Sequence, residues 1–435
     1  MNLQLLSHLT FLTLAWAALT PVLFGLAVLT GRRLSERLMQ GLAAAHSMGL
    51  LAAATVLCIA FIAGPTRMVE VTTAPLIVTH GYEWRAVLLI DRLSVTYLLL
   101  VALIYPVIVR FSQPSFHREE GSRRYWFLVT LLAFSLTALS LAGNIDVLYL
   151  GWELVGVCSV MLISFFRRNP RSAQNSLRAL IYYRLCDLGI LGAAMWIHHA
   201  FPSAEFSHFA EDTVVPTAMG VAFVLLFGTL AKSAQLPMSP WLHRAMEGPS
   251  TSSAIFYGAL SVHLGPLLLL RTSALWMPHT PVRVVMAWIG LTTAAYAALV
   301  GRTRPDAKTS LAYATMAQLG LMYVEIAVGL HTLALVHLCA HAGLRTWQFL
   351  RSSSLIQDFQ DNPLVGTDVR LRRQAHWERL LPERWSGSLY LAASRLFWLD
   401  SLQWSFVARP FLGIFSRLAA FEDRMLGDNP GERKN

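Results

Sequence analysis

One lysine of this sequence lies inside an apolar segment, in the stretch LLFGTLAKSAQLPMSP at residues 225–240. It is Lys232, and because the chain has only three lysines, most of its positive charge is arginine. A desolvated lysine can release its proton near neutral pH, whereas arginine stays protonated. Pro237 cannot donate a hydrogen bond to the carbonyl of Ser233, which frees a polar backbone group beside the ammonium. These features predict a broken helix that carries ions, with Lys232 in the middle of the helix.

Other charged side chains also lie in apolar segments, where each costs about 2.5–3.5 kcal/mol to insert and so needs a partner or a water-lined cavity. Glu153, in GWELVGVCS, is the natural partner for Lys232, although a helix-packing salt bridge is the alternative. Arg184 and Asp187, in YYRLCDLG, are three residues apart and share one helix face. They can therefore pair with each other, either as a structural ion pair at a helix end or as part of an ion path.

His337, His341 and Arg345, in VHLCAHAGLR, recur every four residues. This spacing places them along one stripe of a helix and favours a hydrogen-bonded relay. Two histidines at this spacing could also chelate zinc. No acidic ligand accompanies them nearby in the sequence, so we expect no metal site in this chain.

Three further polar residues could extend such a path. His263 lies three residues before Pro266, which frees the carbonyl of Val262 beside it, and a buried structural role is the alternative. Tyr257 could contribute its hydroxyl. Glu325 is unpaired by any cation nearby in the sequence, and we expect it toward the outer end of its span, where an interfacial position would make it ordinary.

Composition places the chain among polytopic all-α membrane proteins. Of its 435 residues, 55% are hydrophobic and 14% charged, and the mean hydropathy is +0.50. The net charge of +10 does not indicate nucleic-acid binding, because the arginines fall mainly between the hydrophobic runs. The sequence has no phosphate-cradling Gly-rich loop, no flavin or nicotinamide fingerprint and no four-cysteine cluster. We therefore expect no cofactor in this chain and no catalysis by it.

Hydrophobic runs of about 20 residues predict eleven spans, with a twelfth uncertain because residues 388–420 could cross the bilayer or lie flat on it. The predicted spans are 4–30, 38–63, 92–112, 125–142, 145–166, 179–200, 216–236, 252–271, 284–300, 309–330 and 332–350. We divide the chain into N-terminal helices (1–115), an ion-translocating core (116–351) and a polar amphipathic segment followed by a last helix (352–435).

Basic residues follow the odd-numbered spans, which indicates that these ends face the cytoplasm. The arrangement predicts an outward-facing N-terminus and cytoplasmic residues after 351. The residues that carry it are Arg32, Arg33, Arg37, Arg110, Arg118, Arg123, Arg124, Arg167, Arg168, Arg171, Arg302, Arg304 and Lys308.

Several segments together resemble the antiporter-like membrane subunits of respiratory complex I, especially its L subunit, and the related multisubunit cation/proton antiporters. In order they are GWELVGVCSVMLISFF, RLCD, LAKSAQLPMSPWLHRAMEGPSTSSA, DAKTSLAYATMAQLG and HLCAHAGLR. The resemblance implies two inverted five-helix repeats, the second of which is truncated here after its third helix. It also implies a gating ion pair between Glu153 and Lys232. Arg345 stands where the family has a relay lysine, and Tyr257 where it has a histidine.

A shortened L-like chain with these changes is similar to DabB, the family of membrane subunits of DAB inorganic-carbon accumulation systems. This resemblance implies a bacterial inner-membrane protein paired with a large cytoplasmic DabA-like subunit that resembles a zinc carbonic anhydrase. A gradient of protons or sodium ions through the membrane chain would then drive hydration of carbon dioxide to bicarbonate. The alternatives are an L-type proton pump of a complex I-like or membrane hydrogenase complex, and a membrane anchor whose ion path is vestigial.

Overall fold

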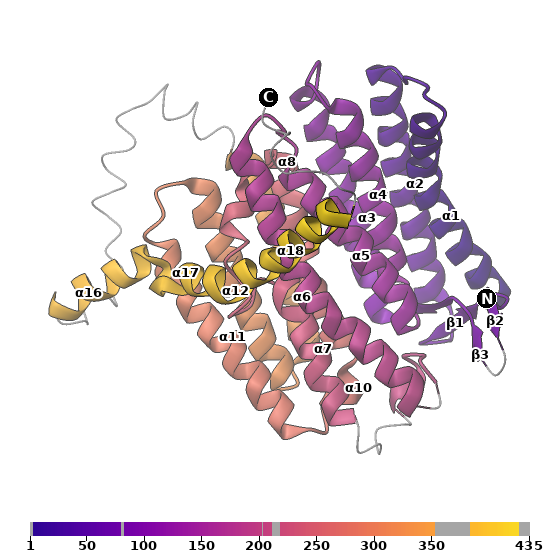
Figure 1. Cartoon of the computed structure of the whole chain (residues 1–435). Coiled ribbons are helices and arrows are strands. Elements are labelled where there is room, and N and C mark those ends of the chain that lie inside the picture. The colour runs from indigo at the N-terminus through magenta and orange to yellow at the C-terminus, as the bar shows by residue number, and fades with distance from the viewer. Residues whose placement is uncertain (1–2, 80–81, 202, 211–217, 353–382, 426–435) are drawn as a thin grey trace. The chain divides into compact units, whose positions relative to one another are not determined.

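The computed structural model describes residues 3–79, 82–201, 203–210, 218–352 and 383–425. The chain divides into two compact units, Met1–Arg373 and Gln374–Asn435. The first unit is a bundle of long helices, which Figure 1 shows running from indigo to orange.

Helices occupy all eleven predicted spans of the first unit, and the all-α membrane fold is confirmed. They are α1 (Leu3–Leu29), α2 (Glu36–Ala63), α3 (Arg92–Ser115), α4 (Ser122–Ser140), α5 (Ile145–Ile163), α6 (Pro170–Ala200), α7 (Ala218–Lys232), the broken segment 250–271, α11 (Thr280–Gly301), α12 (Ala307–Ala327) and α13 (His331–Ser352). In the described part of the chain, seven of these segments are long and apolar enough to cross a membrane on length and composition alone. Short helices η1 (His208–Ala210), η2 (His243–Glu247) and α10 (Ser273–Trp276) lie between them.

Side-chain caps explain where several helices begin. Ser35, Asp91, Asn144 and Asp306 each precede a helix and accept a hydrogen bond from the backbone N–H three residues later. Such a bond satisfies one of the free donors of the first helical turn. These polar residues therefore fix the starts of α2, α3, α5 and α12 at the ends of apolar runs.

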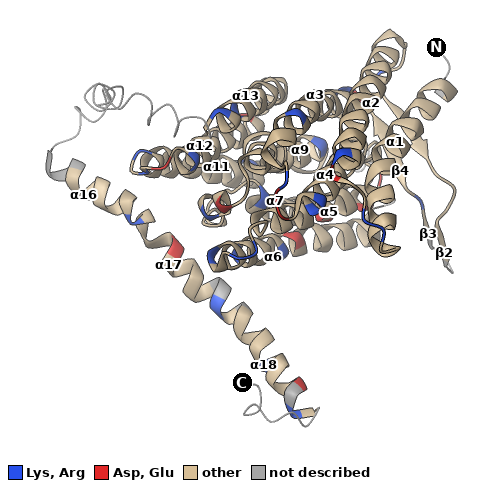
Figure 2. Ribbon diagram, turned by 90° about the horizontal axis from the view of Figure 1, so that it is seen from above, with Lys and Arg blue, Asp and Glu red and all other residues tan. Residues whose placement is uncertain are grey.

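The broken segment forms the centre of the bundle. It comprises α8 (Ser250–Ser253), η3 (Ala254–Ala259), η4 (Ser261–His263) and α9 (Leu264–Arg271). All residues of its 18-residue apolar stretch are buried (100%), compared with 28% of the corresponding stretch of α1 and 33% of that of α11. Seen from above, α1 and α2 lie at one side, α11 and α12 at the other, and α7 and α9 between them (Figure 2). The broken segment is therefore shielded from lipid by other helices.

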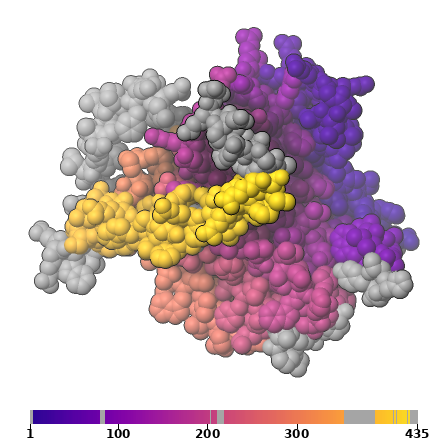
Figure 3. All heavy atoms as spheres, in the orientation of Figure 1, coloured from indigo at the N-terminus to yellow at the C-terminus, as the bar shows by residue number. Residues whose placement is uncertain are grey.

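Helices at the periphery keep large apolar side chains on the outside, as a bilayer requires. Leu12 and Val28 of α1 and Ile62 of α2 are 65%, 72% and 73% exposed. These two helices form the indigo edge of the surface in the space-filling view (Figure 3).

Four short strands, which the sequence patterns did not predict, connect α2 to α3. They are β1 (Val69–Thr72), β2 (Ile77–Thr79), β3 (Tyr82–Trp84) and β4 (Val87–Ile90). β1 pairs antiparallel with β4, and β2 pairs antiparallel with β3. The β4 end is continuous with Asp91, so this small structure positions the start of α3.

The second unit contains α16 (Glu383–Ser394), η6 (Leu396–Trp398), α17 (Leu399–Gln403), η7 (Trp404–Ala408) and α18 (Arg409–Met425). Leu396, Phe397 and Trp398 have positive φ angles of 58°, 49° and 56°, which interrupt the helix. No described segment of this unit meets the length and apolarity criteria for a span. Most of the predicted amphipathic surface segment, residues 353–382, lies outside the described residues.

Candidate ion path

Lys232 is the last residue of α7, so the prediction that it lies in the middle of a helix is wrong, whereas the predicted helix break is present. The chain leaves the helix at Ala234, which has a φ of 49°. The carbonyl of Ser233 accepts a hydrogen bond from Gln235 Nε2 at 2.9 Å, as expected of a group that Pro237 leaves free. The side chain of Lys232 is completely buried. The break therefore places a primary amine at the end of a helix in the interior of the bundle.

Asp187, from the middle of α6, is the carboxylate that faces Lys232. Its Oδ1 atom lies 3.6 Å from Lys232 Nζ and accepts a 2.6 Å hydrogen bond from Trp152 Nε1. Its Oδ2 atom lies 2.9 Å from Arg184 Nη2. The predicted pair of Arg184 and Asp187 is confirmed, but it lies in mid-helix rather than at a helix end, because α6 begins at Pro170.

Glu153 pairs with Arg184, so the expected direct pair of Glu153 with Lys232 is wrong in this structure. Lys232 Nζ instead donates to the carbonyl oxygen of Trp152 and lies 4.5 Å from the centre of its ring. Trp152 and Glu153 are neighbours on α5 and point about 100° apart, because a helix has about 3.6 residues per turn. Arg184 thus occupies the position next to Glu153 that the sequence assigns to the lysine.

Two carboxylates and two cations alternate in this cluster, in the order Glu153, Arg184, Asp187 and Lys232. With all four ionised the net charge is zero, which is the arrangement that permits charges at bilayer depth. Figure 2 shows acidic and basic positions inside the bundle around α5, α6 and α7. A shift of one partner changes the electrostatic surroundings of every other member.

Gly156 is a member of the site that the sequence reasoning did not find. A Cβ at this position would lie 3.2 Å from Lys232 Nζ, 3.4 Å from Lys232 Cε and 3.5 Å from Arg184 Nη2. The absence of a side chain therefore provides the space that the ammonium occupies. The only sequence signal is its position one turn after Glu153 on the same helix.

A hydroxyl joins the break after α7 to the break in the central segment. Ser233 Oγ donates to the carbonyl of Val262 at 2.8 Å and accepts from the N–H of Gly265 at 3.1 Å. This confirms that Pro266 leaves the Val262 carbonyl free for another donor. Ser233 follows Lys232 in the chain, and Val262 precedes His263. The bond therefore links the backbone beside the lysine to the backbone beside His263, the first residue of a second polar cluster.

His263, His341 and Arg345 form a hydrogen-bonded row. His263 Nε2 lies 2.9 Å from His341 Nδ1, and Arg345 Nε donates to His341 Nε2 at 3.1 Å. Because the guanidinium can only donate, His341 Nε2 must accept, and its ring proton therefore resides on Nδ1, facing His263. The structure thus brings together one residue of the central segment and two of the predicted stripe on α13. His263 is fully buried, and His341 and Arg345 are 5% and 9% exposed.

His337, the third member of the predicted stripe, is directed to a different partner. Its Nδ1 lies 2.9 Å from Glu325 Oε1, and its Nε2 lies 3.0 Å from Gln318 Oε1. Glu325 has no cation nearby in the sequence, but it gains a partner in the fold, because α12 and α13 are antiparallel neighbours and bring the two residues together from positions 12 apart in sequence. The ring centres of His337 and His341 are 6.1 Å apart, so the two groups adjoin.

Tyr257 contributes a hydroxyl, as the sequence suggested, but on the side of the lysine cluster. Its OH group lies 3.3 Å from Ser159 Oγ, which lies 3.2 Å from the OH group of Tyr183. The ring of Tyr183 in turn lies 5.7 Å from Lys232 Nζ. η3 is widened at this point, since Leu260 N bonds to the carbonyl of Ile255 five residues earlier. Such widened turns are frequent at functional sites.

The described residues contain no group of three or more His, Cys, Asp or Glu side chains that could hold a metal ion. The site instead offers buried amine, carboxylate, imidazole and hydroxyl groups on helices that are interrupted inside the bundle. Broken helices with ionisable groups at membrane depth define an ion-translocating membrane protein.

The comparisons with known proteins identify the family. Residues 142–368, slightly more than half of the chain, match the family model "NADH:quinone oxidoreductase/Mrp antiporter, TM". The chain belongs to this family of antiporter-like membrane subunits of ion-translocating complexes.

Curated relatives include subunit 5 of the chloroplast NAD(P)H-quinone oxidoreductase of Nephroselmis olivacea, 33% identical over 296 residues, which are 66% of this chain and 45% of the relative. Chain 5 of the NAD(P)H-quinone oxidoreductase of Picosynechococcus sp. is 31% identical over 314 residues, which are 67% of this chain and 47% of the relative. The chain therefore spans about half the length of these relatives.

Two solved structures share the fold. The Mrp complex from Dietzia sp. DQ12-45-1b matches 80% of this chain and 37% of its own chain, with 28% identity and a TM-score of 0.65. An archaeal membrane-bound sulfane sulfur reductase matches 80% of this chain and 70% of its own, with 17% identity and a TM-score of 0.65.

Proposed function

We propose that this chain is the proton-conducting, energy-coupling subunit of a bacterial inorganic-carbon uptake complex. In this proposal it lies in the inner membrane with its N-terminus outside and the residues after 351 in the cytoplasm. The chain conducts ions, and a DabA-like partner with a zinc site resembling that of carbonic anhydrase carries out the hydration of carbon dioxide. The observation that carries the ion-conducting part is the buried contact of Lys232 with Asp187.

The proposed path consists of two clusters, one around Lys232 and Asp187 and one around His263 and His341. The first cluster holds an exchangeable ammonium among carboxylates, so that movement of Asp187 changes how strongly Lys232 holds its proton. The second holds two imidazoles in direct contact, and imidazole both accepts and donates protons near neutral pH. Ser233 follows Lys232 in the chain, and the ring of Tyr183 lies 5.7 Å from Lys232 Nζ. The hydroxyls of Tyr183, Ser159 and Tyr257 form a row that provides polar groups for water.

The coupling to inorganic carbon rests on the residues that differ from the respiratory pattern. Arg345 cannot deprotonate, so protons at this position must use water or the histidines rather than a relay amine. Sodium remains an alternative ion for the same carboxylates. The carbon-uptake assignment follows the resemblance to the DAB membrane subunits, in which such changes occur.

Purification of the tagged complex in mild detergent tests the assignment. Mass spectrometry and metal analysis are expected to identify a large cytoplasmic partner that contains zinc. In cells that depend on carbon accumulation, Lys232→Ala should abolish growth at ambient carbon dioxide while leaving the partner bound. Full growth of this variant would overturn the ion-conducting role and favour a simple membrane anchor.

A second candidate, an L-type proton pump of a complex I-like or hydrogenase complex, is favoured by the names of the curated relatives, NAD(P)H-quinone oxidoreductase subunits. The same purification distinguishes it. Iron–sulfur subunits in place of a zinc subunit, with ion transport dependent on NADH or hydrogen, would establish the pump and contradict carbon uptake.

A further inference from the structure

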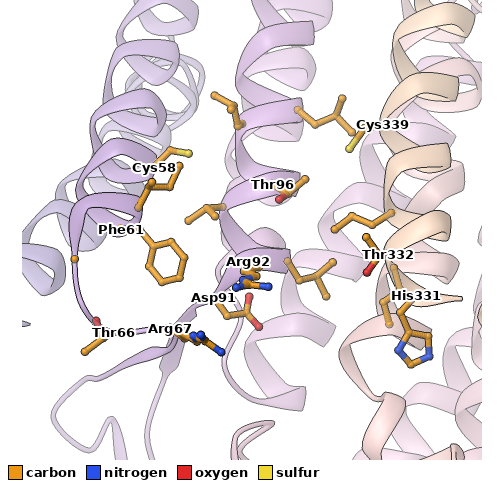
Figure 4. Close-up of a pocket in the computed structure, with 18 of the residues that line it drawn as sticks. Cys58, Phe61, Thr66, Arg67, Asp91, Arg92, Thr96, His331, Thr332 and Cys339 are labelled. Carbon is orange, nitrogen blue, oxygen red and sulfur yellow. The ribbon is translucent and has the colours of Figure 1, made fainter. Parts of the chain in front are cut away.

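A cavity of about 890 Å³ opens between α2, α3 and α13, and no charged residue or histidine of the ion path lines it. Figure 4 shows Arg67 and Arg92 close together at one end of it, with Cys58 and Cys339 farther along on opposite walls. The end of α2 and the starts of α3 and α13 form its mouth, so the mouth lies at one face of the membrane. Deeper in the cavity the wall is apolar and includes Leu103.

The mouth carries a surplus of positive charge. Arg67 and Arg92 are exposed, and in the described part of the chain neither has a hydrogen-bond or ion-pair partner. The carboxylate at the mouth, Asp91, is already neutralised: its Oδ2 lies 2.6 Å from Arg271 Nη1, and its Oδ1 accepts from the N–H of Ser94. Two guanidinium groups are therefore free to bind an anion, and arginine binds phosphate by paired hydrogen bonds.

The depth of the cavity matches one leaflet of a bilayer. Leu103, at its apolar end, follows Arg92 by eleven positions on α3. At about 1.5 Å per residue this is about 16 Å, close to half of the ~30 Å hydrocarbon core. A second cavity of about 810 Å³ continues from it along α3 and α13, sharing Leu100, Leu103 and Cys339.

We propose that this cavity is a binding site for an anionic phospholipid. The phosphate lies between Arg67 and Arg92, the hydroxyls of Thr66 and Thr96 face the headgroup, and the acyl chains lie along the leucines of α3 and α13. A free phosphate ion would use the arginines but not the apolar depth. A transmembrane helix would use the apolar depth but would leave two cations without a counterion. A phospholipid satisfies both halves of the cavity.

Native mass spectrometry of the purified full-length chain provides the test, with phosphatidylglycerol and phosphatidylcholine of identical acyl chains as probes. The double variant Arg67→Gln/Arg92→Gln should weaken phosphatidylglycerol binding by roughly tenfold, because each basic residue near a membrane surface contributes attraction to anionic lipid. The control Arg32→Gln/Arg33→Gln removes the same charge from exposed residues after α1. It should leave the tightest phosphatidylglycerol site intact.

Thiol labelling provides a second readout that does not depend on counting bound lipids. Phosphatidylglycerol should slow maleimide labelling of Cys58 and Cys339 severalfold, whereas phosphatidylcholine should not. Cys158 and Cys186 are buried and serve as internal controls for the folded state. Equal phosphatidylglycerol binding by both double variants, equal protection by the two lipids, or protection by inorganic phosphate alone would each overturn the proposal.

Discussion

Asp187 Oδ1 lies 3.6 Å from Lys232 Nζ, in the interior of the bundle, where both side chains are almost completely shielded. This contact makes Asp187, rather than Glu153, the immediate counterion of the lysine. Glu153 acts on the lysine through Arg184, which contacts both carboxylates. The four charged groups can pair in more than one way. An exchange of partners among them can change which carboxylate contacts Lys232.

Asp187→Asn should reduce ion flux more than Glu153→Gln does. The first change removes the carboxylate next to Lys232, and breaking a buried ion pair costs about 3–5 kcal/mol. The second leaves the contact of Lys232 with Asp187 intact. Flux measured in inverted vesicles that contain the complete complex should fall at least tenfold in Asp187→Asn. Equal losses in the two variants would show that Glu153 acts on the lysine directly.

Gly156→Ala should reduce flux severalfold, because the added Cβ would lie 3.2 Å from Lys232 Nζ and displace the ammonium. Gly192→Ala in α6 is a matched control, since its added Cβ would meet Val224 Cγ1 at 3.8 Å, an ordinary contact. Both changes improve helix propensity by about 1 kcal/mol, so a general effect on the helices would appear in both. Unchanged flux in Gly156→Ala would refute the steric role of this glycine.

Ser233→Ala should destabilise the protein by about 1–3 kcal/mol, the cost of leaving a buried acceptor such as the Val262 carbonyl without its donor. The control is Ser135→Ala, because Ser135 Oγ donates to Leu131 within its own helix, where that carbonyl also has a backbone partner. Thermal denaturation in detergent, followed by tryptophan fluorescence, compares the two. Similar melting temperatures would indicate that the bond contributes little to stability.

His263→Gln and His341→Gln should be strongly coupled in a double-mutant cycle of ion flux. Their ring nitrogens are 2.9 Å apart, and residues in direct contact typically couple by about 0.5–3 kcal/mol. His263→Gln combined with His198→Gln provides the reference pair, because His198 contacts Asp146 and lies apart from the row. Additive effects of His263→Gln and His341→Gln would contradict a shared proton path.

Glu325→Gln should impair flux to the same extent as His337→Gln, and the double variant should be no worse than either single one. The reason is that Glu325 and His337 are paired at 2.9 Å and would act as one unit at the rim of the histidine row. Flux measurements over a range of pH values check this expectation. Multiplying losses in the double variant would assign separate roles to the two residues.

The sequence was sufficient to predict the spans and the helix breaks, because both depend on local chemistry. Apolar runs of bilayer length determine the helices, and the effects of Pro237 and Pro266 on backbone hydrogen bonding are independent of tertiary structure. The stripe of His337, His341 and Arg345 was likewise readable from helical periodicity. Asp187 and Arg184 were correctly paired, since both lie on one helix.

Partners contributed by different helices could not be predicted in the same way. Whether Arg184 or Lys232 meets Glu153 depends on the rotation and packing of α5, α6 and α7, which no sequence spacing reports. The contact of Glu325 with His337 needs the antiparallel arrangement of α12 and α13. The role of Gly156 is a matter of space, and only the position of Lys232 in three dimensions reveals it.

The row from Arg345 through His341 to His263 has a polarity. Both hydrogen bonds run in the same direction, from Arg345 to His341 and from His341 to His263, because the guanidinium at its end has no acceptor atom. In a relay along this row, His341 would have to accept a proton at Nε2, the atom that Arg345 contacts, before it releases one from Nδ1 to His263. Arg345 would therefore have to withdraw from His341 Nε2 before every transfer and return after it. Its side chain would limit the row to one proton at a time.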